Sequence, residues 1–309
     1  MDIYEQIVSY FSGIHGMHLW EEVQALFRRI ASYKPQHWLL PAWACEAVGG
    51  TPDQAISAMV AIACSHISVI LVDDMLDSDP RGEYHRIGAP AAANLACAFQ
   101  AAGLEAIAHC EIELGTRLTA LDSLNQMILT TTLGQHLDVQ GVADEASYWR
   151  VVRTKSSPFF GTALHIGALL GGGSVEIAWQ LNETGRLYGE MIQIHDDMND
   201  AMDVPANSDW ISGRSSLPIL FAQIVEHPDR QRFLALRQEA FDPEKLAEAQ
   251  AILIRCGAIS YGIDQLIRRY QKCRKLLHDT PLRKGEVLEA MFDEVIHPIK
   301  ELLSALEMT

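Results

Sequence analysis

Two acidic runs in this sequence carry side chains that can bind metal ions. Asp73-Asp74-Met75-Leu76-Asp77 and Asp196-Asp197-Met198-Asn199-Asp200 both read Asp-Asp-x-x-Asp. On a helix, the first and fifth residues of such a run lie on one face, one turn apart. Carboxylate oxygens are the ligands that Mg²⁺ prefers, and water and substrate phosphate oxygens usually complete its shell. Two facing clusters therefore predict a site for a diphosphate held between metal ions.

Each acidic run ends a long apolar segment. A helix end that is acidic only because it is exposed to solvent has no reason to show this arrangement twice. Residues 67–72 precede the first run and residues 187–194 precede the second. A single copy would fit a charged surface, but two copies in matching contexts favour binding sites. A calcium loop does not fit the first run, because Arg81 stands at its fifth position and Gly88 where a bidentate Glu belongs.

The elements that must position these runs are predicted to be helices throughout. Apolar residues recur with the helical period of 3.6, and alternating β-branched runs are nearly absent. No linker or low-complexity segment divides the chain, so we expect one all-α domain over residues 1–309, a bundle of long helices around the core. The predicted helices cover 2–13, 19–32, 38–48, 52–77, 88–113, 115–141, 146–171, 175–201, 215–226, 229–238, 243–255, 258–278 and 284–306.

Composition excludes several classes of function. The net charge is −16, so no basic patch is expected and no nucleic-acid partner. Six cysteines are scattered without any Cys-x-x-Cys, which predicts reduced, buried thiols in a cytoplasmic protein. No secretory signal is visible. The longest apolar stretch, Ala58 to Val72, is too short to span a membrane and carries His66, so we expect a core helix and no transmembrane segment.

Further motifs surround the acidic runs in a fixed order. They are Gly88-x-Pro90-Ala91-Ala92-Ala93-Asn94, Gly134-Gln135-x-x-Asp138, Tyr148 to Lys155-Ser156, Gln193-Ile194-His195 and Gly213-Arg214-Ser215-Ser216-Leu217-Pro218. With them, the chain resembles the trans-isoprenyl diphosphate synthase (polyprenyl synthetase) family from about Lys34 to Tyr270. This family shares its fold with class I terpene synthases. The resemblance implies a helical bundle of the isoprenoid synthase type with a central active-site cavity, and a homodimer.

The resemblance implies that the acidic runs bind an allylic isoprenyl diphosphate through three Mg²⁺ ions. The metals would stabilise the departing pyrophosphate as Lewis acids and leave an allylic carbocation in an apolar cavity. Asp74 would support the metal ligands, and Asp197 completes the set of catalytic aspartates. The metal ligands would be Asp73, Asp77, Asp196 and Asp200.

Cationic and polar side chains complete the implied diphosphate site. Lys155 matches the family lysine that contacts the allylic diphosphate, and Arg214 stands where a second lysine is usual. Gln193, about one turn before Asp197, would stabilise the cation or the metal shell. Arg81 or Arg86 would supply an arginine to the diphosphate, although the family's arginine doublet is broken here.

The segment from Gln36 to Pro41 departs from the family pattern. Family members carry Gly-Gly-Lys-Arg-x-Arg-Pro there, and the three cations bind the diphosphate of isopentenyl diphosphate. Here only the proline remains. Each charged hydrogen bond is worth roughly 1.5–3 kcal/mol, so losing three would weaken the binding of a second diphosphate by orders of magnitude. His66 fits a contact to the second substrate and a core residue equally well.

Small residues before the first acidic run predict a long substrate. Ser68 and Val69 stand where short-chain synthases place aromatic residues that stop elongation. We therefore expect a substrate of C15–C20 or longer.

Three functions fit these residues. The sequence narrowly favours ionisation of an allylic diphosphate with release of pyrophosphate, followed by cyclisation, quenching or transfer to another acceptor. The alternative is a polyprenyl diphosphate synthase that condenses the allylic diphosphate with isopentenyl diphosphate through other residues, such as His37, His66 and Arg86. A non-catalytic partner subunit ranks last, because such a subunit should lose metal ligands first and all six aspartates are present.

Overall fold

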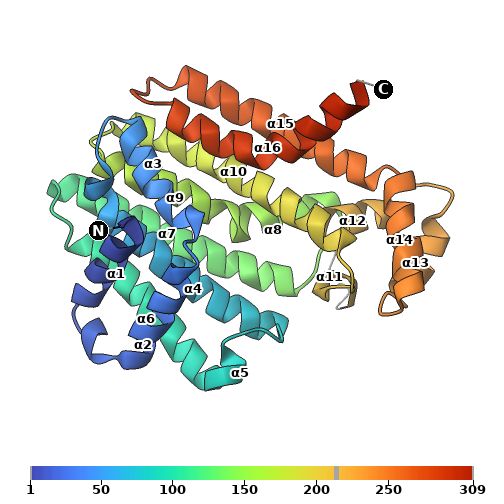
Figure 1. Cartoon of the computed structure of the whole chain (residues 1–309), viewed down its shortest axis with the longest axis horizontal. Helices are drawn as coiled ribbons and strands as arrows, with labels where there is room; N and C mark the ends of the chain where they lie inside the picture. Colours follow the sequence, from blue (N-terminus) through green and yellow to red (C-terminus); the bar gives the residue numbers. More distant parts are fainter. Residues whose placement is uncertain (1, 212–215, 308–309) are drawn as a thin grey trace. The chain divides into compact units, whose positions relative to one another are not determined.

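The computed structural model describes residues 2–211 and 216–307, and every regular element in these ranges is a helix (Figure 1). The predicted all-α fold class is therefore confirmed. The helices are α1 (Ile3–Gly13), α2 (Glu21–Ser32), α3 (Leu40–Ala47), α4 (Ile56–Asp77), α5 (Tyr84–Ile87), α6 (Ala89–Ala108), α7 (Leu114–Val139), α8 (Glu145–Lys155), α9 (Ser157–Leu170), α10 (Val175–Met202), α11 (Ser208–Ile211), α12 (Leu217–Ile224), α13 (Arg230–Arg237), α14 (Pro243–Arg255), α15 (Ala258–Asp279) and α16 (Glu286–Glu307), with the 3-10 helices η1 (Met17–Leu19), η2 (Gln36–Leu39) and η3 (Pro52–Ala55).

Helix α4 carries the first acidic run at its carboxyl end. It is apolar on nearly all sides and mostly buried, as expected for a helix that runs through a core. It ends at Asp77, because Ser78 adopts the left-handed conformation (φ 54°) that terminates many helices. Helix α6 crosses it closely at Gly103, where a Cβ would lie 3.1 Å from the carbonyl oxygen of Ala61. The acidic run is thus held at the end of a tightly packed helix.

Two segments are long and apolar enough to cross a membrane by length and composition alone. They are Pro52–Asp77 and Ala89–Ala108. In the first, 72% of the apolar window is buried inside the protein, and in the second 44% is. Helix α4 is therefore the core helix that the sequence predicts.

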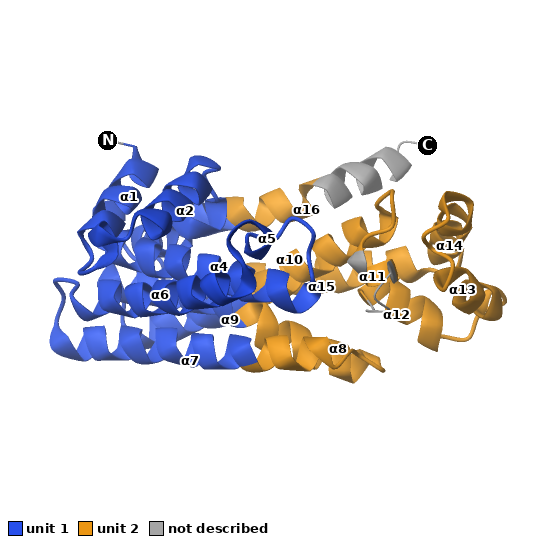
Figure 2. Cartoon of the chain, turned by 90° about the horizontal axis from the view of Figure 1, so that it is seen from below, with its two compact units in different colours: residues 1–132, 158–186, 276–289 blue, residues 133–157, 187–275, 290–309 orange. Residues whose placement is uncertain are grey.

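The chain divides into two compact units, each assembled from three separate stretches of sequence (Figure 2). Unit 1 comprises Met1–Thr132, Pro158–Arg186 and Leu276–Glu289, and unit 2 comprises Leu133–Ser157, Leu187–Lys275 and Ala290–Thr309. The first acidic run belongs to unit 1 and the second to unit 2. The single domain expected over residues 1–309 stays a prediction.

An aromatic stack in unit 1 holds η2, the segment that departs from the family pattern. Phe11 of α1 and Phe27 of α2 stack with ring centroids 3.9 Å apart, and Phe99 of α6 lies 5.7 Å from Phe11. The Trp38 ring of η2 lies 5.4 Å from Phe27 and is fully buried. Large buried rings of this kind dominate core energetics, so the stack fixes the backbone around Trp38.

A second core, in unit 2, fixes the carboxyl end of α10. The Trp210 and Phe233 rings pack edge to face with centroids 6.0 Å apart. The Trp210 indole nitrogen donates a hydrogen bond to the carbonyl of Ala201 at 3.3 Å, and the Gln250 amide donates to the same carbonyl. Ala201 directly follows the second acidic run, so these contacts hold the end of that run in place.

One predicted helix, 146–171, is wrong: the structure has α8 and α9 in its place, separated at Ser156. Pro158 explains the break, because proline has no backbone N–H to continue the helical hydrogen bonds of α8, whereas it is tolerated in the first turn of α9. As a result, Lys155 stands at the end of a helix. The short helices α5 and α11 were not predicted. The helix expected from residue 215 begins at Leu217, after its N-cap Ser216, and residues 212–215 lie outside the described ranges.

Candidate active site

The first acidic run occupies the last turn of α4 in unit 1. Asp73 and Asp77 are four residues apart on this helix and so share one face. Burial, reinforced by the carboxylates of Asp79 and Asp73, raises the pKa of Asp74 to about 6. Negative charges at a helix carboxyl end also face the negative end of the helix dipole. A cation bound here would relieve both kinds of repulsion.

The loop after α4 holds the two arginines predicted to contact diphosphate. Arg81 pairs with Asp79 at 2.9 Å, and Arg86 pairs with Glu83. Glu83 also accepts a hydrogen bond from Arg29 at 2.6 Å. The Arg81 side chain is 89% exposed, and exposed ion pairs contribute little in water. A diphosphate would therefore displace Asp79 from Arg81 at small cost.

His37, in the segment where the resemblance implies three cations, forms a partly buried pair with His66 of α4. The His37 ring in η2 lies 4.1 Å from the His66 ring of α4, and Phe159 of α9 lies 5.8 Å from His37. The Trp38 indole donates to Nδ1 of His66 at 3.2 Å, so neutral His66 carries its proton on Nε2. Burial lowers the pKa of His37 to about 4. Burial and the neighbouring His37 lower the pKa of His66 well below its usual value. Both rings are neutral at pH 7.

Ser68 and Val69, predicted to allow a long substrate, lie one turn before the first acidic run on α4. Ser68 is fully buried, and its hydroxyl has no hydrogen-bond partner within the described ranges. Val69 is half-buried. Their effect on substrate length stays a prediction.

The second acidic run lies near the end of α10 in unit 2, and its aspartates face different surroundings. The Asp196 side chain is 57% exposed and lies 3.6 Å from the His195 imidazole, which raises the pKa of His195. Asp200 is half-buried, but Asp197 is only 4% exposed. The first and last carboxylates therefore share one face of α10, while Asp197 points into the protein.

Three donors converge on the carboxylate of Asp197. The Tyr148 hydroxyl and the Leu217 N–H donate to Oδ2 at 2.6 Å and 2.7 Å, and the Gln193 amide donates to Oδ1 at 2.8 Å. The Ser156 hydroxyl donates to the Gln193 amide oxygen at 2.6 Å, which fixes the orientation of that amide. Burial raises the pKa of Asp197 to about 7, although the three hydrogen bonds oppose it.

Lys155 is held by α7 in two ways. Its ammonium group pairs with Asp138 at 2.5 Å, and both side chains are mostly buried. One turn earlier on α7, a Cβ at Gly134 would lie only 2.3 Å from the backbone nitrogen of Lys155, so only glycine permits this approach. The motif Gly134-Gln135-x-x-Asp138 therefore positions the lysine that follows it.

The structure brings Lys155, Gln193 and Asp197 together in unit 2, while His66 and the first acidic run share α4 in unit 1. Arg214 lies outside the described residues. No role for Tyr148 or Asp138 is predicted from the sequence, although both belong to the motifs that resemble the family. The spacing between Tyr148 and Lys155 could have indicated a role for the tyrosine, because Tyr148 precedes Lys155 by two helical turns.

A buried ion pair in unit 2 was also missed. Glu190 of α10 accepts hydrogen bonds from Arg153 of α8 at 3.0 Å and from Arg269 of α15 at 2.7 Å. The Arg269 guanidinium lies 3.8 Å from the centre of the Trp149 ring. Arginine stacks on aromatic faces and bridges carboxylates, so this cluster ties α8, α10 and α15 together.

The carboxylates of both runs suit a metal bound jointly with a diphosphate. No group of three or more His, Cys, Asp or Glu among the described residues is arranged to hold a metal by itself. Pairs of carboxylates suit Mg²⁺, which keeps several waters and binds substrate phosphates. The crowding around Asp74 shows that the first run would gain from a cation. Asp73 and Asp77 of unit 1, and Asp196 and Asp200 of unit 2, are the predicted metal ligands, and their assignment stays a prediction.

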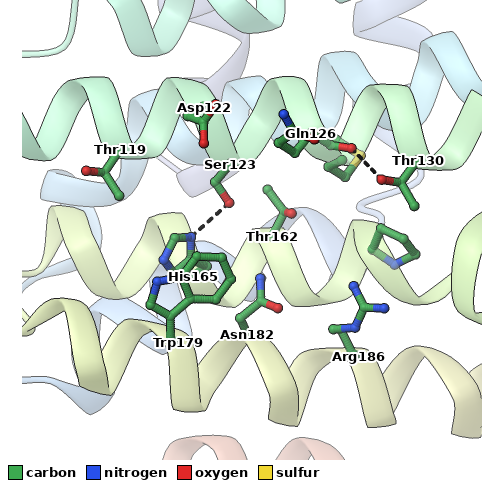
Figure 3. A pocket seen from close by; sticks show the side chains of 12 residues that line it. Thr119, Asp122, Ser123, Gln126, Thr130, Thr162, His165, Trp179, Asn182 and Arg186 are labelled. Atoms are coloured by element: carbon green, nitrogen blue, oxygen red, sulfur yellow. Dashed lines mark hydrogen bonds between the residues drawn. The ribbon is translucent and has the colours of Figure 1, made fainter.

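A separate pocket of about 130 Å³ lies in unit 1 among α7, α9 and α10 (Figure 3). His165 is fully buried at its side, with Nδ1 2.8 Å from the Ser123 hydroxyl and the Trp179 ring 4.5 Å away. Burial lowers the pKa of His165 to about 4. None of the predicted site residues lines this pocket, whose walls are Thr119, Asp122, Ser123, Gln126, Met127, Thr130, Pro158, Thr162, His165, Trp179, Asn182 and Arg186.

Comparison with known sequences decides the family. Residues 31–253 match the sequence profile described as polyprenyl synthetase, a stretch that includes both acidic runs. The chain belongs to the polyprenyl synthetase family. The resemblance found in the motifs is confirmed, and the protein is a prenyltransferase-type enzyme. The substrates of polyprenyl synthetases are isoprenyl diphosphates, whose diphosphates they typically bind through divalent metal ions.

Curated polyprenyl synthetases are similar over most of this chain. The short chain isoprenyl diphosphate synthase of Methanothermobacter thermautotrophicus is 28% identical over 70% of this chain and 71% of its own length. The geranylgeranyl diphosphate synthase of Methanosarcina mazei is 32% identical over 58% of this chain and 60% of its own. The octaprenyl diphosphate synthase of Haemophilus influenzae is 25% identical over 76% of this chain and 74% of its own.

Solved structures of polyprenyl synthetases share the fold. The geranylgeranyl pyrophosphate synthetase of Pyrococcus horikoshii superposes with a TM-score of 0.82 at 22% identity, over 95% of this chain and 94% of that one. A polyprenyl synthase of Caulobacter crescentus, solved with calcium and isoprenyl diphosphate, gives 0.79 at 18% identity, over 95% and 93% of the two chains. At these identities, the likeness shows the fold alone.

Proposed function

We propose that this enzyme condenses an allylic isoprenyl diphosphate with isopentenyl diphosphate in the presence of Mg²⁺ and releases pyrophosphate. The family match across both acidic runs carries the proposal. The similar curated proteins are named as short chain, geranylgeranyl and octaprenyl diphosphate synthases, all of which make diphosphates. They support chain elongation better than the reaction without isopentenyl diphosphate that the sequence narrowly favoured.

In this proposal, the chain binds and orients the allylic diphosphate at two sets of side chains. The paired carboxylates at the end of α4 would bind metal ions, and so would those at the end of α10; such ions supply Lewis-acid stabilisation of the leaving pyrophosphate when bound. Lys155 donates to the diphosphate, and its ion pair with Asp138 keeps the ammonium in place. Arg81 supplies a second cation from the loop after α4.

Product analysis tests the proposal. The purified protein is incubated with Mg²⁺ and farnesyl or geranylgeranyl diphosphate, with and without isopentenyl diphosphate, and both pyrophosphate and organic products are measured. Pyrophosphate release should require isopentenyl diphosphate and yield longer diphosphates. Release from the allylic substrate alone, with a hydrocarbon or an alcohol as product, would refute elongation.

One observation favours a second candidate function, the ionisation of an allylic diphosphate followed by cyclisation or quenching. Neutral His37, paired with neutral His66, lies in the segment where the family pattern has cations, and neutral rings attract a second diphosphate weakly. A neutral pair instead suits an apolar substrate chain or a neutral acceptor. Product analysis separates the two candidates, because only the second releases pyrophosphate from the allylic substrate without isopentenyl diphosphate.

A further inference from the structure

Asp197 sets the direction in which the metal-binding pair of α10 points. Successive residues of a helix are rotated by about 100°, so Asp196 and Asp200 lie roughly 100° and 60° from Asp197, on the same side of it. Asp197 is buried, and its two oxygens accept three hydrogen bonds. A helix whose inward residue is fixed by three donors cannot rotate without breaking them. The outer carboxylates therefore keep one orientation.

Helix α8 is tied to α10 at two points by this network. Near its start, the Tyr148 hydroxyl donates to Asp197 at 2.6 Å. At its end, the Ser156 hydroxyl donates to Gln193, one turn before Asp197 on α10, and Gln193 donates onward to Asp197. Two contacts about two turns apart fix both the distance and the angle between the helices. Lys155 precedes Ser156 and is placed with it.

We propose that Tyr148 and Asp197 are positioning residues, which hold the metal-binding carboxylates of α10 and the diphosphate-binding Lys155 of α8 in one fixed arrangement. The proposal rests on the proposed function for the roles of Asp196, Asp200 and Lys155. Asp197 then acts through its neighbours, since its oxygens already serve Tyr148, Gln193 and the backbone of Leu217.

The same carboxylate also fixes the start of α12. The Leu217 N–H, which donates to Asp197, lies at the first turn of that helix, where backbone N–H groups lack partners within the helix. One carboxylate thus joins three helices of unit 2 around the second acidic run. Asp197 orients Asp196 and Asp200 through the helix that all three share, and loss of the groups that orient metal ligands typically weakens metal affinity about 10–100-fold.

The test is Tyr148→Phe, which removes one hydroxyl and keeps the ring. Calorimetric titration with Mg²⁺ and inorganic pyrophosphate gives the affinity of the diphosphate site without any prenyl substrate. We expect about tenfold weaker binding and a similar rise in the Mg²⁺ concentration needed for half-maximal activity. Ser156→Ala, which cuts the second link, should shift both quantities in the same direction by a smaller factor.

Tyr270→Phe is the matched control. Tyr270 is also a buried tyrosine of unit 2 that donates to an aspartate, Asp293, but neither residue belongs to an acidic run. Both variants should melt at a lower temperature, and only Tyr148→Phe should lose affinity for Mg²⁺ and pyrophosphate. Unchanged affinity in Tyr148→Phe, or equal losses in the two variants, would overturn the proposal.

The same titration separates this inference from the proposed function. A wild-type protein that binds Mg²⁺ and pyrophosphate, yet makes no longer diphosphate, refutes the proposed function and leaves the comparison of Tyr148→Phe with Tyr270→Phe decisive. A wild-type protein that binds no Mg²⁺ and pyrophosphate refutes both.

Discussion

Replacing His165 by asparagine should remove a pH dependence that this buried imidazole gives to the stability of the protein. His165 is fully buried, and Nδ1 lies 2.8 Å from the Ser123 hydroxyl (Figure 3). An asparagine amide reaches the position of Nδ1, so it can keep the bond to Ser123 without a group that titrates. The variant therefore isolates the proton-binding property of the ring.

The expected magnitude follows from the pKa. Burial lowers the pKa of His165 from 6.5 to about 4. The folded state thus binds the proton less readily than the unfolded chain, so the stabilisation is complete above the unfolded pKa and is lost as pH falls towards the folded one. Linkage at about 1.36 kcal/mol per pKa unit predicts a loss of about 2 kcal/mol of unfolding free energy at pH 5, relative to pH 7.5.

Urea denaturation followed by circular dichroism measures this loss. Wild type and His165→Asn are unfolded at pH 7.5 and at pH 5, and the change in unfolding free energy between the two pH values is compared. The wild type should lose about 2 kcal/mol more than the variant, since every other titrating group is common to both. Equal losses in the two proteins would refute the argument that His165 is held neutral by burial.

Two further substitutions test the candidate active site, each against a matched control. Asp73→Asn should lower Mg²⁺-dependent pyrophosphate release at least about 100-fold, because it removes a charged ligand. The control is Asp53→Asn in η3, an exposed position, which should leave the rate of release unchanged. Equal rates in the two variants would contradict the metal assignment. Gly134→Ala should lower the unfolding free energy by about 1–3 kcal/mol or more and lower activity, because its Cβ would overlap the Lys155 backbone. Gly13→Ala, which has open space around it, should leave both unchanged; a stable, active Gly134→Ala protein would contradict the close helix crossing.

The sequence predicted the parts of the fold that depend on local pattern. Helices α4 and α10 end close to the expected residues, because their apolar faces and their acidic ends are written in consecutive positions. The break between α8 and α9 was missed, although Pro158 signalled it. Apolar residues follow the helical period on both sides of Ser156, so the pattern predicted one continuous helix despite that single proline.

The contacts around Asp197 could not be predicted, because they join residues far apart in the chain. Tyr148 precedes Asp197 by 49 residues, and Leu217 follows it by 20. Nothing in the local pattern distinguishes the middle aspartate of an acidic run from its neighbours. Its burial depends on which way α10 faces, which is set by packing among several helices.

The boundaries of the two compact units limit where related genes for this protein can recombine. Each unit draws on three stretches of sequence, so the chain passes between the units five times, and each passage falls inside a helix: α7, α9, α10, α15 or α16. Recombination between related genes at any of these boundaries would join two halves of different helices. The two acidic runs therefore cannot be exchanged as separate modules, and we expect homologous genes to carry them as a linked pair.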